Sequence, residues 1–219
     1  DGQLVAFPTE TVYGLGANAA DGSAVGRIFA AKGRPANHPL IVHLPSGDHI
    51  DDWAVDVPRL ARELAARFWP GPLTLVLRRV PAVPLAVTGG QDTIALRVPA
   101  HPVAHGLLQE FGGGLAAPSA NRFGRVSPTR AGHVQEELGE GVALILDGGP
   151  SEVGVESTIL DLTGERPRLL RPGGIGREEL EAALGAELTG PGSGPRVSGS
   201  LPAHYAPASP LRLVASGEL

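Results

Sequence analysis

The clearest candidates for chemistry in this chain are a lysine and an arginine two positions apart, in Lys32-Gly33-Arg34. Lys32 is the one lysine among 18 basic residues, and the other 17 (18 − 1) are arginine. Since an ammonium and a guanidinium bind anions in different geometries, the pair is suited to a polyanion such as a chain of phosphates. The same residues also fit a solvated helix end, where cations are favoured, so both interpretations stay open here.

A second candidate is the segment 8–18, which combines two threonines, among them Thr11, with a glutamate and closely spaced glycines. We expect a loop between a strand and a helix, in which the glycines let the backbone approach a ligand closely. The full dinucleotide fingerprint and the Walker A pattern are both missing, so a plain strand-to-helix turn fits the segment equally well.

A third candidate is the segment 116–121, where small residues, including Ala117, surround Ser119 and Asn121. Eight residues after Ser119, Ser127 is followed by proline, which predicts a helix start with serine as N-cap and proline in the first turn. Helix N-termini also bind phosphate, so a capping role and a binding role are compatible.

Four polar residues are set in apolar, strand-like runs: Thr93, Arg97, Ser157 and Arg171. Burying an unpaired charge costs several kcal/mol, roughly, so both arginines should have anionic partners. Those partners could be a ligand or an internal carboxylate, and the sequence leaves both open.

Composition excludes several kinds of chemistry. The chain has 0 cysteines, which removes disulfides and thiolate zinc sites. His38 and His43 are five positions apart across a loop-to-strand junction, and odd-spaced residues in an extended segment face opposite ways, so we do not expect a metal pair. The net charge of −5 disfavours non-specific nucleic-acid binding. What remains is an enzyme that positions phosphates and a small polar substrate.

These residues must be positioned by the strands and helices of the fold, which the sequence interleaves without strict alternation. This order predicts an α/β (mixed α+β) fold, in which helices cover a twisted sheet of mixed parallel and antiparallel strands. The expected strands are 4–7, 40–44, 73–78, 93–98, 142–146, 157–162 and 168–170, and the expected helices are 23–32, 58–68, 102–111, 128–138 and 177–184.

We expect one catalytic domain over residues 1–185 and a Gly/Pro-rich linker over 186–210 that ends in His-Tyr-Ala-Pro at His204 and Tyr205. Residues 211–219 then resemble the first strand of a truncated further domain. No run of 18 apolar residues and no signal peptide are visible, so a cytoplasmic chain without membrane contact is expected. The missing initiator methionine favours a piece of a longer product.

Taken in order, the motifs resemble the YrdC-like family of threonylcarbamoyl-AMP synthases, whose fold is YrdC/RibB-like. The likeness runs from about Leu4 to Arg171 and carries the family's Lys-x-Arg and Ser-x-Asn signatures. The resemblance implies that L-threonine, bicarbonate or CO2, and ATP condense to threonylcarbamoyl-AMP and pyrophosphate. This nucleotidyltransferase reaction is assisted by Mg2+ held by the ATP phosphates rather than by side chains, and it supplies a downstream tRNA-modifying transferase.

The resemblance also assigns site residues. Lys32 and Arg34 would neutralise the leaving pyrophosphate as catalytic groups, and His204 and Tyr205 of the linker would fold over the site. The expected ATP-binding residues are Arg34, His38, Thr93, Ser119, Asn121, Ser127 and Arg171, and the expected threonine-binding residues are Thr11, His43, Arg97, Ala117 and Ser157.

Two rival functions remain. A domain of this fold could bind double-stranded RNA through a basic concave face, in which case its affinity should fall steeply with salt. The chain could also be the carbamoyltransferase domain of a hydrogenase maturation factor, although the acylphosphatase-like module and the Cys-rich zinc fingers of such proteins are not visible in this sequence.

Overall fold

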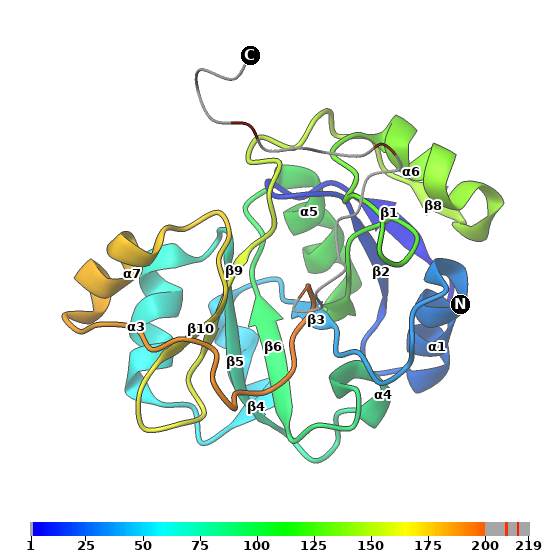
Figure 1. Ribbon diagram of the computed structural model, residues 1–219. Coiled ribbons are helices and arrows are strands. Elements are labelled where there is room, and N and C mark those ends of the chain that lie inside the picture. The colour runs from blue at the N-terminus through cyan, green and yellow to red at the C-terminus, as the bar shows by residue number, and fades with distance from the viewer. Residues whose placement is uncertain (1, 200–208, 210–213, 215–219) are drawn as a thin grey trace.

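The protein is built on a ten-stranded mixed sheet with the strand order β10-β9-β5-β6-β3-β7-β2-β1-β8, and β4 pairs with β5 off this path. The computed structural model describes residues 2–199, 209 and 214. Parallel pairs (β3 with β6, β5 with β9, β1 with β8) alternate with antiparallel ones. The predicted fold class is confirmed (Figure 1).

The predicted strands and helices recur with shifts of a few residues, and short elements are added between them. The strands are β1 Val5–Phe7, β2 Gly14–Asn18, β3 Ile41–His43, β4 Ala54–Val55, β5 Leu73–Arg79, β6 Thr93–Arg97, β7 Leu115–Ala116, β8 Leu144–Ile145, β9 Thr158–Asp161 and β10 Arg168–Arg171. The helices are α1 Gly22–Lys32, α2 Ile50–Trp53, α3 Arg59–Phe68, α4 Leu85–Thr88, α5 Pro102–Phe111, α6 Ala131–Leu138 and α7 Arg177–Leu184, with 3-10 turns at Gly47–His49 and Gly139–Gly141.

The central strands have two chemically different faces because side chains alternate along a strand. Leu75 of β5 and Leu96 of β6 point into the main core, where they pack with residues of α1, α3 and α7. The intervening residues Val76 and Ala95 belong to a separate, small apolar cluster on the opposite face. Arg97 continues this second face, since it is two positions from Ala95, and the polar candidates gather there.

Helix α1 delivers Lys32 to the sheet. The Asp21 side chain accepts hydrogen bonds from the backbone N–H groups of Ser23 and Ala24, which fixes the start of the helix. Gly33 ends it in the left-handed conformation with φ 61°, which glycine adopts at no steric cost. The chain therefore turns between Lys32 and Arg34 and keeps both cations on the same side.

Two local expectations were wrong. Residues 14–18 form strand β2 rather than a continuous loop, and β2 pairs antiparallel with β1. Glycine lowers strand propensity, but Gly16 is needed because the ring of Phe7 lies where a Cβ would be. Helix α6 starts at Ala131 with Arg130 at the N-cap position, so Ser127 is not the cap.

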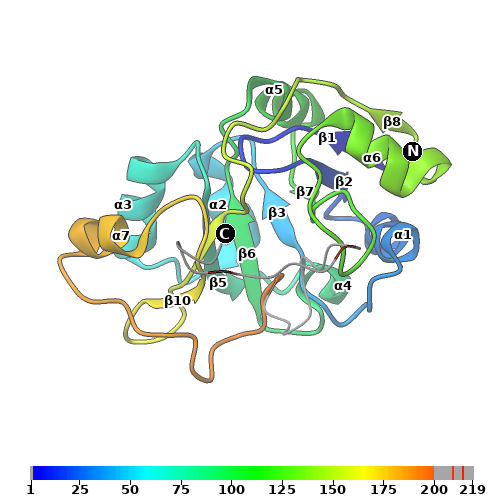
Figure 2. The ribbon, with the colours of Figure 1, turned by 45° about the horizontal axis from the view of Figure 1, so that its top comes forward.

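After α7, the described residues up to position 199 lie along the sheet. Leu169 donates its backbone N–H to Thr189, and Val197 packs in the second apolar cluster beside Val76 and Ala95. Figures 1 and 2 show this segment crossing the sheet from α7 towards β3. His204 and Tyr205 lie outside the described residues.

Within the described part of the chain, no helix has both the length and the apolar character needed to span a bilayer.

We predict that Gly173→Ala destabilises the fold. A Cβ at Gly173 would collide with the backbone of Glu156 and Ser157, which cannot yield as a flexible side chain can. Overpacking of this kind costs about 1–3 kcal/mol, and urea unfolding measures it. The matched control is Gly106→Ala in α5, where no atom lies within 4 Å of the added methyl and a gain of about 0.5–1 kcal/mol is expected. Equal stability of the two variants would contradict the prediction.

Candidate active site

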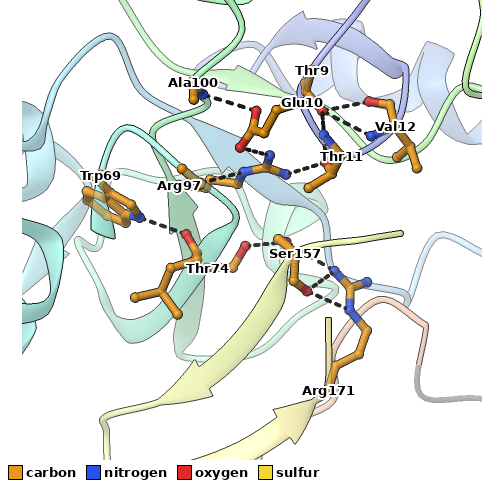
Figure 3. A network of polar contacts seen from close by, with 12 residues as sticks. Thr9, Glu10, Thr11, Val12, Trp69, Thr74, Arg97, Ala100, Ser157 and Arg171 are labelled. Atoms are coloured by element: carbon orange, nitrogen blue, oxygen red, sulfur yellow. Dashed lines mark hydrogen bonds and ion pairs between the residues drawn. The ribbon is translucent and has the colours of Figure 1, made fainter. Parts of the chain in front are cut away.

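Most of the predicted site residues meet on the second face of the sheet. They surround a cavity of about 30 Å³, which has room for one or two water molecules. The hydrogen-bond network on one side of it is drawn in Figure 3. The predicted residues that line the cavity are Thr11, His43, Arg97, Ala117, Ser119, Ser157 and Arg171.

Arg97 is fully enclosed, and each part of its guanidinium has a partner. It donates to a carboxylate oxygen of Glu10 at 2.6 Å, to the Thr11 hydroxyl at 3.0 Å and to the Gly71 carbonyl at 3.2 Å (Figure 3). The second oxygen of Glu10 accepts the Ala100 N–H at 3.0 Å. Burial lowers the pKa of Arg97, and Glu10 opposes this by favouring the charged form. Of the two alternatives that the sequence left open for Arg97, the internal carboxylate is present.

Arg171 joins the ends of β9 and β10. It donates to the Ser157 carbonyl at 2.8 Å and to the Ser157 hydroxyl at 3.2 Å, and it forms an ion pair of 2.6 Å with Glu156. The Ser157 hydroxyl is in turn 2.8 Å from the hydroxyl of Thr74. Ser127 donates to the other oxygen of Glu156 at 2.8 Å, so Glu156 ties Ser127 to Arg171.

Lys32 is buried rather than solvated, with 3% of its surface exposed. Its ammonium donates to the backbone carbonyls of Ser119 and Asn121, both at 2.5 Å. Burial, followed by the charge of Arg34, lowers the pKa of Lys32 to about 7. The two carbonyls occupy two N–H groups of Lys32, which is all that the neutral amine has. Protonation to the ammonium form adds a third N–H group, which can donate to an anion. The interpretation as a solvated helix end is therefore wrong.

Arg34 does not line the cavity but bonds to Ser198, which does. Its guanidinium donates to the Pro39 carbonyl at 2.9 Å and to the Ser198 hydroxyl at 3.2 Å, and it sits 5.8 Å from the centre of the Phe123 ring. His38 packs edge-on against the same ring at 5.3 Å. Burial and then Arg34 lower the pKa of His38, so this imidazole is neutral at pH 7.

His43 and Arg97 are direct neighbours at the ends of the parallel strands β3 and β6. Burial, followed by the charge of Arg97, lowers the pKa of His43 to about 3, so the ring is neutral at physiological pH. The ring packs edge-on against Phe7 at 6.1 Å. Its buried Nδ1 atom has no hydrogen-bond partner among the described residues, which leaves a polar atom for a ligand.

Thr93 stands apart from the cavity, and Ala117 takes part only through its backbone. Thr93 lies on the same face as Arg97 but four positions back along β6, about 13 Å at the usual rise of a strand. It lines a neighbouring cavity under Val197 and Ser198 rather than the central one. Ala117 lines the central cavity, but its backbone N–H already donates to the Ile41 carbonyl at 2.9 Å, so its carbonyl is the main-chain group left for a ligand.

Four residues of the network were not predicted: Glu10, Glu156, Thr74 and Ser198. Each carboxylate directly precedes a predicted residue in sequence, as Glu10-Thr11 and Glu156-Ser157. Because buried arginines need anions, these two acids could have been identified as the internal partners. Thr74 and Ser198 had no comparable signal, since a strand hydroxyl and a linker serine are both common.

The described residues offer no cage for Mg2+. No group of three or more acidic or histidine side chains is assembled in the part of the chain that the structure describes. Both carboxylates of the site already accept hydrogen bonds through each of their oxygens. The expectation that Mg2+ is held by ATP phosphates stays a prediction.

With this arrangement in place, the comparisons with known proteins define the class. The family model Sua5_yciO_yrdC, which bears the description "Telomere recombination", matches residues 1–173. The chain therefore belongs to the Sua5/YciO/YrdC family, and the predicted resemblance is confirmed.

Individual relatives narrow this class. The threonylcarbamoyl-AMP synthase of Pyrococcus abyssi (strain GE5 / Orsay) is 55% identical over 84% of this chain and 54% of its own length. The enzyme of the same name from Bacillus subtilis (strain 168) is 47% identical over 97% of this chain and 63% of its own. A crystal structure of P. abyssi Sua5 complexed with L-threonine has a TM-score of 0.91 and 50% identity, covering 95% of this chain and 63% of that one. The chain thus spans between half and two thirds of the relatives' length.

We predict that Lys32 titrates near neutrality. Because the chain has a single lysine, selective 13C labelling of lysine gives one Cε signal by NMR, and its midpoint should lie near pH 7. The folded pKa is below the unfolded one, so the unfolded state binds more protons between pH 7 and about 10.4. The free energy of unfolding of the wild-type protein, measured relative to that of Lys32→Met, should therefore rise with pH across that window. A midpoint above pH 9 would exclude this environment.

Proposed function

We propose that the chain is a threonylcarbamoyl-AMP synthase, which condenses L-threonine, bicarbonate or CO2, and ATP to threonylcarbamoyl-AMP and pyrophosphate. The observation that carries the proposal is the position of four cationic side chains. Arg97 and Arg171 line the cavity together with hydroxyls and the neutral imidazole of His43. Lys32 and Arg34 lie directly behind it, bonded to its lining residues Ser119 and Ser198. Lys32, Arg34 and Arg171 are suited to phosphates, and Arg97 is suited to an amino-acid carboxylate. The relatives of the same name support this assignment.

The proposed chemistry needs no protein nucleophile. The amino group of threonine adds to bicarbonate and loses water, which gives a carbamate. A carbamate oxygen then attacks the α-phosphorus of ATP in line, the bond to the β-phosphate oxygen breaks, and pyrophosphate leaves. The role of Lys32 and Arg34 is to neutralise the charge that develops on the leaving group.

Threonine would lie beside Arg97, and the complex of the P. abyssi relative with L-threonine supports a threonine site in this fold. The Nδ1 atom of His43 and the hydroxyls of Thr11 and Ser157 could meet its polar groups. The ATP side would extend from Lys32 and Arg34 over Ser119, Asn121, Ser127 and Arg171, with His38 and Thr93 at its ends.

The larger context is part of the same proposal. Residues 1–185 would form the catalytic domain, 186–210 a linker and 211–219 the start of a further domain. The product would pass to a tRNA-modifying transferase in the cytoplasm, where ATP and tRNA are found. Because Val197 and Ser198 pack directly on the site, the first part of the linker would contribute to the substrate pocket.

We predict that Arg34→Ala abolishes synthesis. Losing one donor to the developing charge costs about 10²–10³ in rate, while the melting temperature should change little. Incubation with ATP, Mg2+, bicarbonate and labelled threonine, followed by chromatography for threonylcarbamoyl-AMP, measures the yield. Arg62→Ala is the control, since Arg62 forms an exposed ion pair with Asp51, and exposed pairs contribute little to stability. A normal yield from Arg34→Ala would remove the assignment.

Arg97→Lys should separate the two substrates. Lysine keeps the charge that compensates the buried Glu10 but loses the fork that grips a carboxylate. We expect the KM for threonine to rise about tenfold or more, which corresponds to about 1.4 kcal/mol, and the KM for ATP to stay nearly constant. Initial rates with each substrate varied in turn provide the measurement. Equal increases in both KM values would place Arg97 outside the threonine site.

A further inference from the structure

The ion pair between Glu156 and Arg171 separates two cavities. On one side is the central cavity of about 30 Å³. On the other side is a larger, mainly apolar cavity of about 420 Å³, bordered by Val126, Val155 and Pro172. Three residues, Val12, Glu156 and Arg171, line both cavities. The central cavity alone is too small for an amino acid, so this boundary must open if both substrates are to meet.

The Glu156 carboxylate occupies hydrogen-bond donors that could also bind an anionic ligand. One of its oxygens accepts from Ser127 at 2.8 Å and the other accepts from Arg171 at 2.6 Å. Its side chain is 14% exposed and that of Arg171 is 9% exposed, so water screens the pair only weakly. A phosphate offers the same donors the same kind of charged oxygen, and two anions cannot share them without repulsion.

We propose that Glu156 is a resident anion that holds Ser127 and Arg171 when no nucleotide is bound, and that a phosphate group of ATP displaces it. The inference rests on the proposed function, because it takes these two residues as ligands of ATP. Displacement of the carboxylate joins the two cavities into one compartment. Glu156 therefore sets mainly the affinity of the nucleotide site. Its charge also acts on Arg97, but less than that of Glu10, which bonds to Arg97 directly.

The test is Glu156→Gln, which keeps the shape of the side chain and removes its charge. Direct binding of ATP is measured by calorimetry without threonine or bicarbonate, once with Mg2+ and once with a chelator. We expect ATP to bind about tenfold tighter in both conditions, the effect of removing one like charge nearby, and threonine affinity to change less than ATP affinity. Glu181→Gln is the matched control. Glu181 lies in α7, outside both cavities. It also forms an ion pair, with Arg177 at 3.0 Å, and accepts a backbone hydrogen bond, from Leu188.

Other outcomes overturn the inference. Weaker ATP binding in both conditions would make Glu156 a support for Arg171, and weaker binding only with Mg2+ would make it a metal ligand. If the Gln variant does not fold, Glu156→Asp takes its place, because the shorter side chain retains the charge but draws the carboxylate back from Ser127 and Arg171. The Asp variant should also bind ATP more tightly than the wild type. Unchanged or weaker ATP affinity of the Asp variant contradicts the inference. Failure of the wild-type protein to bind ATP would instead overturn the proposed function and this inference together.

Discussion

The structure depends on keeping buried cations charged inside a protein core. Arg97 and Arg171 each have an internal carboxylate within 2.6 Å, and removing one member of such a pair costs about 3–5 kcal/mol. Lys32 is held instead by two backbone carbonyls, and burial followed by the charge of Arg34 lowers its pKa to about 7.

The two faces of the sheet explain how one set of strands serves both stability and binding. Alternation along β5 and β6 sends Leu75 and Leu96 into the main core. It sends Thr74 and Arg97 to the opposite face, where Thr74 meets Ser157 and Arg97 lines the cavity. The apolar cluster around Val76 and Ala95 anchors the binding face, and Val197 completes it from the far end of the chain. Rigid strands thus hold the polar groups more firmly than a surface loop could.

Much of this arrangement could be predicted from the sequence. The period-2 pattern and the turn residues identified the principal strands, and the ordered motifs brought Lys32, Ser119 and Arg171 to one site. Strand β2 was missed because Gly14 and Gly16 carry no strand signal, and its reason is tertiary: the Phe7 ring occupies the space above Gly16. The start of α6 was misplaced because Ser127 bonds to Glu156, a residue 29 positions away whose position no local pattern specifies.

The distances along the chain between partners have a consequence for biosynthesis. Arg97 meets Glu10 across 87 positions and Lys32 meets the Asn121 carbonyl across 89, while the segment near Ser198 reaches Arg34 across 164. On the ribosome, Lys32 can therefore meet its partners only after residue 121 has emerged, and Arg34 can meet Ser198 only near the end of the domain. Non-local contacts of this kind slow folding, so the site is completed late in synthesis.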